Sequence, residues 1–316
     1  MKPDHAPIRG IVVPLITPFN EAGEVDEPAV ERLVAFLIDA GVHGLFALGS
    51  SGEFVSLNAR KKQRMVSAVI RAAAGRVPVC VGVSGNCLED IREETRWAAR
   101  AGANAVAALP PFYFRCSQTE LVRFFSAIAE AGPVPLLIYN MPFRTNNNLE
   151  PETVERLADH PNIAGIKDTV ADMARTLDLL GRLRDREDFA YLHGNELLTV
   201  PSLLFGAKGA VPAIANFAPE VMVGAWEAAR AGDVERLKHL NSRIQRLMRV
   251  WSLLEARPNE STTLRLQAIK MVLERMGICR SYMAQLEEPP SLERLRKVQE
   301  FMQAEGLPDR VGEPEA

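Results

Sequence analysis

The sequence predicts a (β/α)8 TIM barrel followed by a C-terminal α-helical appendage. Three observations lead to this fold class: short apolar runs recur eight times, segments with helix start and stop signals separate them, and the Gly-rich turn of dinucleotide-binding folds is missing. Continuous apolar runs are typical of parallel strands that are covered on both faces. Eight strand–helix units in about 230 residues favour a closed barrel over an open, doubly wound sheet.

The eight expected strands follow one another along the first two thirds of the chain. They span residues 11–14, 45–48, 79–83, 105–109, 136–139, 163–167, 190–193 and 210–213. Helix signals lie between them. Asp26 precedes a helix that is expected to end at Gly41. Ser117 and Glu120 form a capping box for another helix, which Gly132 closes. Each unit therefore has the order strand, loop and helix.

Beyond Gly232 the sequence shows helical patterns only. We expect helices from 233 to about 257, over 261–276 and over 291–304, with breaks at Pro258 and at Pro289-Pro290. The expected division is a catalytic barrel over residues 1–232, a helical domain over 233–306 and a polar, frayed tail over 307–316.

Composition limits the possible functions. With 316 residues, of which 47% are hydrophobic and 24% charged, the chain can bury a large core. The formal charge of -3 and the lack of a basic, aromatic-rich segment argue against nucleic acid as a partner. The first five residues do not resemble a secretory signal, and no apolar run approaches the length of a membrane span. We therefore expect a cytoplasmic protein that does not contact membranes.

Cysteine and histidine spacing gives no metal signature. The four cysteines form no CxxC pair, and the five histidines are dispersed without an HExxH motif. We expect reduced cysteines, no disulfide framework and no protein-bound metal. The cysteines are Cys80, Cys87, Cys116 and Cys279.

The C-terminal ends of the expected strands carry residues suited to chemistry, and the active site of such a barrel lies at that end. The second strand leads into residues 49–53, with the sequence Gly-Ser-Ser-Gly-Glu. The fourth leads toward Tyr113, the fifth ends at Tyr139 and the sixth at Lys167. Each tyrosine alone is more often an ordinary half-buried residue, and a lone lysine at a strand end usually reaches solvent. Their joint occurrence favours a functional site.

Lys167 is the candidate nucleophile. Strands five and six are expected to be neighbours about 4.8 Å apart, which places Tyr139 beside Lys167 at the barrel mouth. Alternation along the strand puts Gly165 on the side of Lys167, where it would leave space beneath the lysine, and turns Asp168 away. An amine without a nearby carboxylate in an apolar mouth is desolvated. Its neutral form can then attack a ketone to give a Schiff base.

Residues 49–52 form a turn that precedes a helix with Asn58 as its expected cap. The backbone N–H groups of the turn and the hydroxyls of Ser50 and Ser51 could bind an anion. Such a turn is also a common tight connection between a strand and a helix. Phosphate is its usual ligand, but two hydroxyls without a following Lys or Arg suit a small carboxylate at least as well.

Together, these residues resemble the dihydrodipicolinate synthase/N-acetylneuraminate lyase superfamily of pyruvate-dependent class I aldolases. The resemblance covers nearly the whole chain. It rests on residues 49–53, on residues 139–142 (Tyr-Asn-Met-Pro) and on residues 165–168 (Gly-Ile-Lys-Asp), in the order and spacing of the family. It implies an imine between Lys167 and pyruvate, or the pyruvyl part of a 2-oxo acid. It also implies that neither a cofactor nor a metal takes part.

The resemblance implies further roles. Ser50 and Ser51, with their backbone amides, would hold the pyruvate carboxylate, and Tyr139 would shuttle protons and orient the aldehyde. Tyr113 matches a tyrosine that reaches into a neighbouring subunit's site in this family and completes a relay with Ser50 and Tyr139. A homotetramer built from two tight dimers is expected by analogy. Further residues expected to bind substrate are Gly49, Gly52 and Val211.

The identity of the aldehyde stays open between two alternatives. Arg144 matches the arginine that binds the carboxylate of aspartate semialdehyde in the synthases, which favours a 4-hydroxy-tetrahydrodipicolinate synthase type. Asn146 stands where the synthases usually have glycine, and residues 216–219 (Asn-Phe-Ala-Pro) look closer to the 2-keto-3-deoxy sugar acid aldolases, such as the 2-keto-3-deoxygluconate type. Asn195 and Glu196, after the seventh strand, could contact the hydroxyls of a polyol.

The resemblance also bears on regulation. In lysine-inhibited synthases the effector binds polar and aromatic residues at a dimer interface, and here only Asn86 is similar to that set. Ala59, Lys62 and Phe112 stand where the family has histidine, histidine and tyrosine. We predict no strong feedback by lysine.

Two other function classes compete with the aldolase. A catalytically silent barrel that binds a 2-oxo acid would keep the turn at 49–52, but it would not need Lys167 with its tyrosines. A phosphate-binding barrel enzyme usually has a Gly-rich basic loop after strands seven and eight. Here Glu196 would repel a phosphate.

Overall fold

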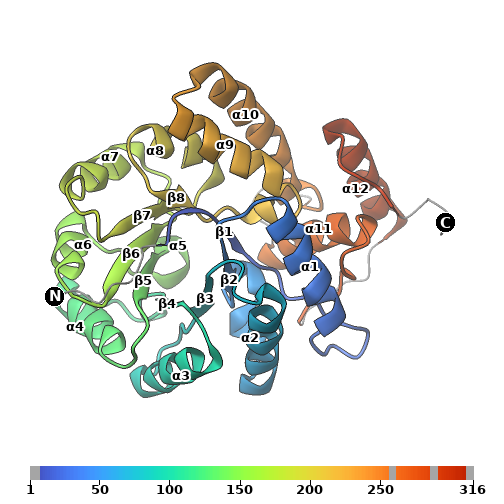
Figure 1. The fold of residues 1–316 in the computed structure, drawn as a ribbon. Coiled ribbons are helices and arrows are strands. Elements are labelled where there is room, and N and C mark those ends of the chain that lie inside the picture. Colours follow the sequence, from blue (N-terminus) through green and yellow to red (C-terminus); the bar gives the residue numbers. More distant parts are fainter. Residues whose placement is uncertain (1–7, 256–260, 285–290, 311–316) are drawn as a thin grey trace.

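A computed structural model describes residues 8–255, 261–284 and 291–310. Eight parallel strands form a closed barrel in sequence order, and the last strand pairs with the first (Figure 1). This confirms the predicted fold class. The strands are β1 (Gly10–Pro14), β2 (Gly44–Ala47), β3 (Val79–Gly82), β4 (Ala105–Ala108), β5 (Leu136–Asn140), β6 (Ile163–Asp168), β7 (Ala190–His193) and β8 (Gly209–Ala210).

Helices surround the barrel and continue beyond it. The barrel helices are α1 (Glu27–Asp39), α2 (Ala59–Ala73), α3 (Leu88–Ala101), α4 (Gln118–Ala129), α5 (Pro142–Thr145), α6 (Pro151–Ala158), α7 (Met173–Arg182), α8 (Thr199–Leu204) and α9 (Pro219–Ala231). Short 3-10 turns are η1 (Ser50–Gly52), η2 (Phe54–Ser56), η3 (Glu196–Leu198), η4 (Ala213–Asn216) and η5 (Met248–Ser252). The C-terminal helices are α10 (Val234–Leu247), α11 (Thr262–Arg275) and α12 (Leu292–Glu305).

Three barrel helices begin at the capping residues that the sequence predicts. The side chains of Asp26 and Asn58 accept hydrogen bonds from backbone N–H groups at the starts of α1 and α2. Ser117 and Glu120 form the expected capping box of α4. Each cap satisfies an N–H group that the first helical turn leaves without a partner. These residues therefore set where each barrel helix begins.

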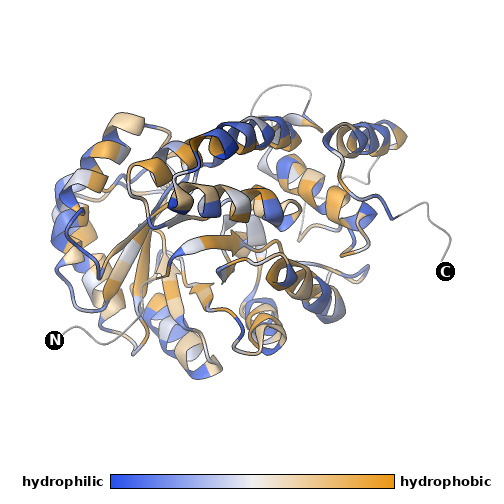
Figure 2. Cartoon of the chain, turned by 45° about the horizontal axis from the view of Figure 1, so that its top comes forward, coloured by the Kyte–Doolittle hydropathy of each residue, from blue (hydrophilic) through white to orange (hydrophobic). Residues whose placement is uncertain are grey.

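The strands form the centre of the core. Nearly every strand residue is buried, as expected for a parallel sheet between a packed barrel interior and a ring of helices. In Figure 2 the hydrophobic colouring concentrates on the strands, whereas hydrophilic residues recur along the surrounding helices. The barrel thus offers a rigid frame for the loops at its mouth.

The eighth strand is shorter than predicted. Gly209 has a φ of 159°, and a Cβ atom there would lie 2.1 Å from the carbonyl oxygen of Gly10. A side chain at residue 209 would therefore not fit where β8 meets β1, and the regular pairing of the two strands covers two residues. Val211 still donates its N–H to the carbonyl of His193, but Ala213 already begins η4.

The C-terminal region departs from the sequence prediction in two places. The helix expected to run from 233 to about 257 ends at Leu247 and continues as the 3-10 turn η5; its predicted end and the breaks at Pro258 and Pro289-Pro290 lie outside the described residues. The first part of the predicted frayed tail is packed. Leu307 is buried, and Asp309 forms an ion pair with Arg275 of α11. Among the described helices, none is long and apolar enough to span a membrane.

Candidate active site

Tyr139 and Lys167 are direct partners across the β5–β6 ladder. Only 4% of Lys167 is exposed. Its Nζ lies 4.1 Å from the centroid of the Tyr139 ring and 5.1 Å from that of Phe46. The two rings meet edge to face, with centroids 6.0 Å apart. The amine therefore faces aromatic surface in place of bulk water.

The turn after β2 lies next to this lysine pocket. The Oγ of Ser50 is 3.2 Å from the hydroxyl oxygen of Tyr139, which in turn lies 3.2 Å from the Sδ of Met141. Ser50 and Ser51 are the first residues of η1, and the first N–H groups of a helical turn have no partner within it. The turn thus offers N–H groups and hydroxyls near the amine, as an anion-binding site requires.

A cavity of about 480 Å³ connects these groups at the barrel mouth. It brings together eight of the predicted site residues: Ser50, Ser51, Tyr139, Arg144, Lys167, Asn195, Glu196 and Val211. Part of its wall comes from the C-terminal region. The contributing residues there are Met248, Trp251, Thr262, Arg265 and Leu266.

Three predicted site residues do not line the cavity. Gly49 and Gly52 shape the turn: the Gly52 N–H donates to the Gly49 carbonyl at 3.0 Å, and the Gly52 carbonyl accepts from Thr17 Oγ1 at 2.7 Å. Tyr113 is 80% exposed, has a φ of 84° and stacks edge to face on the exposed Phe114. Within one chain it lies outside the cavity.

Glu196 is a buried carboxyl group in the same cavity as Lys167. Its Oε1 accepts a hydrogen bond from the Ala213 N–H at 2.7 Å. Burial raises the pKa of Glu196, while backbone N–H groups and the positive charge of Lys167 oppose that rise. The expectation of an amine without a nearby carboxylate is therefore only partly right. Among the described residues no ion pair joins Lys167 to a carboxylate, but Glu196 is close enough to interact with its charge.

Asp168 faces away from the lysine, as predicted. Arg175 Nε donates to Asp168 Oδ2 at 3.2 Å, and Asn140 Nδ2 donates to Oδ1 at 3.1 Å. Burial raises the pKa of Asp168, and the positive charge of Arg175 counteracts part of this effect. These bonds join the ends of β5 and β6 to α7. They fix the backbone on either side of the candidate nucleophile.

His193, at the end of β7, supports the next loop. Its Nδ1 accepts the Asn195 N–H at 3.0 Å, and its Nε2 lies 3.4 Å from Thr176 Oγ1. Burial lowers the pKa of His193 to about 4. The ring is therefore neutral at pH 7 and carries its proton on Nε2, because Nδ1 acts as an acceptor. It orients the loop that carries Asn195 and Glu196.

Gly165 and Gly194 are the two candidate sources of space beside Lys167. A Cβ at Gly165 would lie 2.4 Å from the backbone oxygen of Ala190, so the space that this glycine leaves is used by the close approach of β7 to β6. A Cβ at Gly194 would lie 3.0 Å from Cε of Lys167 and 2.4 Å from Cγ2 of Thr169. Gly194 is therefore the residue that accommodates the lysine side chain.

Arg144 lies over the cavity and is held by the C-terminal region. Its Nη2 donates to Oγ1 of Thr262 in α11, and its guanidinium carbon lies 5.5 Å from the ring centroid of Phe143. Asn146, two residues later, has a φ of 60°, a conformation that glycine and asparagine adopt most readily. Asn146 can therefore adopt the backbone conformation that a glycine would adopt at this position.

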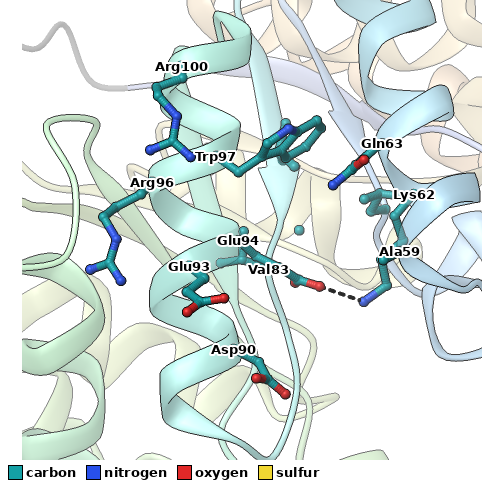
Figure 3. Close-up of a pocket in the computed structure, with 13 residues that line it drawn as sticks. Ala59, Lys62, Gln63, Val83, Asp90, Glu93, Glu94, Arg96, Trp97 and Arg100 are labelled. Atoms are coloured by element: carbon teal, nitrogen blue, oxygen red, sulfur yellow. Dashed lines mark hydrogen bonds and ion pairs between the residues drawn. The ribbon is translucent and has the colours of Figure 1, made fainter.

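A second cavity of about 460 Å³ lies between α2 and α3 (Figure 3). Lys62 Nζ donates to Glu94 Oε1 at 3.0 Å within it, beside Trp97 and two arginines. The arginines are Arg96 and Arg100.

Sequence reasoning missed the C-terminal contribution to the active-site cavity and the supporting roles of His193 and Arg175. The predicted break at Pro258 separates α11 from the barrel in sequence, and nothing in the local sequence of α11 indicates that it lines the cavity. For His193 the available signal was its position at the end of a strand, next to Gly194-Asn195-Glu196. In the part of the chain that the structure describes, no cluster of three or more His, Cys, Asp or Glu residues could hold a metal.

Comparisons with known proteins agree with this geometry. Residues 7–304 match the dihydrodipicolinate synthetase family. A 4-hydroxy-tetrahydrodipicolinate synthase of Laribacter hongkongensis is 37% identical over 270 residues, which cover 85% of this chain and 89% of that protein.

Two solved structures share the fold. YagE, a prophage protein of the dihydrodipicolinic acid synthase family from E. coli K12 in complex with pyruvate, superimposes with a TM-score of 0.88 at 30% identity and covers 95% of this chain and 99% of its own. Dihydrodipicolinate synthase from Bacteroides thetaiotaomicron gives a TM-score of 0.88 at 32% identity, with the same coverage. With its barrel, its buried lysine and these relatives, the chain belongs to the dihydrodipicolinate synthetase family.

Proposed function

We propose that this protein is a class I pyruvate-dependent aldolase of the 4-hydroxy-tetrahydrodipicolinate synthase type. The observation that carries the proposal is the buried amine of Lys167, 4.1 Å from the ring of Tyr139 and in one cavity with Ser50. In this mechanism the amine attacks C2 of pyruvate, and the resulting carbinolamine loses water to form a protonated imine. The imine withdraws electrons from C3, which loses a proton to give an enamine. The enamine carbon then attacks the carbonyl carbon of an aldehyde, whose oxygen takes up a proton. Cleavage of the imine finally releases the product and restores the amine of Lys167.

Several of the predicted site residues have a role in this reaction. Ser50 and Ser51 with their N–H groups would bind the pyruvate carboxylate, and Tyr139 would move protons between the substrate and Ser50. Arg144 would bind the carboxylate of the aldehyde substrate, since its guanidinium suits a bidentate contact. Covalent chemistry on Lys167 requires neither a cofactor nor a metal.

A 2-keto-3-deoxy sugar acid aldolase is the second candidate. It is supported by Asn195 and Glu196, whose polar groups line the cavity beside Lys167 and could bind hydroxyl groups of a sugar acid. The two candidates share the imine and differ in the aldehyde. A panel of aspartate semialdehyde, glyceraldehyde and N-acetylmannosamine with pyruvate, ranked by kcat/KM, distinguishes them. A higher value for glyceraldehyde than for aspartate semialdehyde would reject the synthase type.

Incubation with pyruvate and borohydride, followed by intact mass measurement, tests the shared chemistry. The wild-type protein should gain one reduced pyruvyl adduct, and Lys167→Ala should gain none. Lys208→Ala is a matched control, because this lysine bonds to Arg186 and Glu187 outside the cavity. An adduct that survives Lys167→Ala would place the imine on another amine and reject the mechanism. No adduct on the wild type would instead support a catalytically silent barrel.

A homotetramer of two tight dimers and a cytoplasmic location complete the proposal. The support for assembly is Tyr113, which is exposed together with Phe114 near the barrel mouth and would enter a neighbouring subunit's site beside Ser50 and Tyr139. Tyr113→Ala should then lower both activity and the fraction of tetramer in sedimentation velocity.

A further inference from the structure

Glu53 and Lys270 form a buried ion pair between the turn after β2 and helix α11. Lys270 Nζ lies 2.6 Å from Glu53 Oε1, across 217 positions of sequence. The same ammonium donates to the carbonyl of Tyr282 at 2.7 Å and lies 4.4 Å from the ring centroid of Phe19. Glu53 Oε2 accepts the N–H of Ala284 at 2.9 Å. Lys270 is fully buried and Glu53 is 7% exposed, so neither charge is solvated by bulk water.

The backbone around this carboxylate adopts an unfavourable conformation. Leu48 has a φ of 59° and Glu53 a φ of 56°, so two residues with side chains occupy the left-handed region on either side of the turn. Such residues keep this conformation only where the surrounding structure holds them there. At Glu53 the ion pair and the Ala284 N–H supply that constraint, and both come from the C-terminal region.

Glu53 belongs to the turn that would bind the pyruvate carboxylate, and a backbone hydrogen bond joins it to Ser50. Its N–H donates to the Ser50 carbonyl at 3.2 Å, which closes the turn containing Ser50 and Ser51. The hydroxyl of Thr17, which follows β1, donates a hydrogen bond to the Gly52 carbonyl. A movement of Glu53 would therefore displace the anion-binding N–H groups and change the 3.2 Å separation between Ser50 Oγ and the Tyr139 hydroxyl.

We propose that Lys270 is a positioning residue for pyruvate binding: through its ion pair with Glu53, the C-terminal helical region holds the 49–53 turn in its carboxylate-binding conformation. This inference rests on the proposed function of the turn. Lys270 acts through Glu53 and does not contact the substrate. In this proposal the C-terminal region does more than cover the barrel, because the position of Lys270 in α11 then determines the affinity for pyruvate.

The test is a double variant, Glu53→Gln/Lys270→Met. Each single change would leave one buried charge without its partner and could unfold the protein, whereas the double change removes both charges. The glutamine side chain still offers an amide oxygen to the Ala284 N–H. The readout is the fraction of protein trapped by borohydride as a function of pyruvate concentration, measured by intact mass. It needs no knowledge of the aldehyde.

We expect the half-saturating pyruvate concentration to rise about tenfold, as when one hydrogen bond to a charged group is weakened, with the maximal trapped fraction unchanged. A purely structural role would instead lower the maximal fraction at an unchanged half-saturating concentration, and this result would overturn the inference. A folded double variant with wild-type saturation would overturn it equally. If the wild-type protein traps no pyruvate, the proposed function fails first.

A second ion pair of the C-terminal region serves as the control, in the double variant Arg246→Met/Glu305→Gln. This pair joins α10 to α12 at 3.2 Å, with Glu305 almost fully buried, and does not touch the 49–53 turn. Its removal should change thermal stability without changing pyruvate saturation. A similar rise in the half-saturating concentration in this control would show that any weakening of the C-terminal region has the same effect, which would contradict a specific role for Lys270.

Discussion

The ring of Tyr139 covers the amine of Lys167 at 4.1 Å, while the hydroxyl of the same tyrosine lies 3.2 Å from Ser50 Oγ. One side chain therefore contacts the candidate nucleophile and the candidate anion site at the same time. The ring excludes water from the amine, and the hydroxyl lies where it can pass a proton between a bound carbonyl compound and Ser50. These two contributions can be separated by mutation.

Tyr139→Phe keeps the ring against Lys167 and removes the hydroxyl. Loss of a general acid–base group typically slows catalysis by about 10²–10⁴-fold, so kcat should fall in this range. Tyr191→Phe is the control: its hydroxyl is also buried, but it lies 3.3 Å from Thr176 Oγ1 behind the sheet. Steady-state rates of both variants with pyruvate and aspartate semialdehyde measure the difference. Equal losses in the two variants would argue against a proton-transfer role for Tyr139.

Arg144→Ala removes the cation proposed to bind the carboxylate of aspartate semialdehyde. We expect kcat/KM for this aldehyde to fall about 10–100-fold, the effect of losing a charge-assisted hydrogen bond, and pyruvate trapping to stay unchanged. Thr262→Val is the control, because it removes the partner of Arg144 in α11 and retains the charge. If Arg144→Ala barely alters the use of aspartate semialdehyde, the synthase assignment loses its main support.

The sequence predicted the barrel because each strand is visible locally, as a short apolar run between helix caps. The regular alternation of such runs with helices is sufficient to indicate a parallel barrel. The length of β8 was not predictable in this way. Strand β8 pairs with β1, which is distant in sequence, and Gly209 is the partner of Gly10 in that pairing. The packed part of the tail is another long-range effect, since Asp309 forms an ion pair with Arg275, and α12 lies between the two residues in sequence.

The candidate site was predictable where neighbouring strands determine it. The pairing of Tyr139 with Lys167 follows from strand order and register alone. The contribution of the C-terminal region was not predictable, because nothing in the local sequence around Lys270 indicates that its partner is Glu53. A lysine in the middle of a helix is expected at the surface, and only the assembled structure shows Lys270 buried together with its neighbours in α11.

The neutral state of His193 predicts a loss of stability in acid. Burial lowers its pKa to about 4, below the ordinary value of 6.5, so the unfolded chain takes up a proton before the folded one does. The stabilising contribution is complete above pH 6.5 and falls as the pH drops toward 4. Between pH 7.5 and pH 5 the loss should be about 2 kcal/mol.

Urea unfolding at fixed protein concentration, at pH 7.5 and at pH 5, measures this loss in the wild type and in His193→Gln. The variant lacks the titrating ring, so its free energy of unfolding should change less between the two pH values by about 2 kcal/mol. The pKa values of Asp168 and Glu196 are raised and contribute with the opposite sign in both proteins, so they cancel in the comparison. An identical pH dependence would mean that His193 titrates normally.

Lysine should not act as a strong inhibitor. In the cavity between α2 and α3, the ammonium group of Lys62 already binds Glu94 at 3.0 Å, so this carboxylate, one of three that line the cavity, is occupied (Figure 3). Ala59, on the same wall, offers no side-chain donor or acceptor. Steady-state rates with sub-millimolar L-lysine should equal those without it. Inhibition in this concentration range would contradict the prediction.

Three glycine-to-alanine changes should have three different outcomes, because the added methyl group meets different atoms. In Gly165→Ala the Cβ would lie 2.4 Å from the Ala190 carbonyl oxygen, and a backbone atom in a barrel cannot yield easily. We expect a loss of about 1–3 kcal/mol in the free energy of unfolding. In Gly194→Ala the Cβ would lie 2.4 Å from Cγ2 of Thr169 and 3.0 Å from Cε of Lys167, and both are side-chain atoms that can move. Displacing a reacting atom by about 1 Å can cost about 10²-fold in rate.

Gly181→Ala is the control for both changes. Gly181 lies within α7 with no atom near the position of its missing Cβ, so alanine should leave activity unchanged and stabilise the helix by about 0.5–1 kcal/mol. Urea unfolding and borohydride trapping of the three variants separate the effects. Gly165→Ala should mainly change unfolding, and Gly194→Ala should mainly lower the rate at which pyruvate is trapped. If Gly194→Ala traps pyruvate at the wild-type rate, the space for Lys167 does not depend on this glycine.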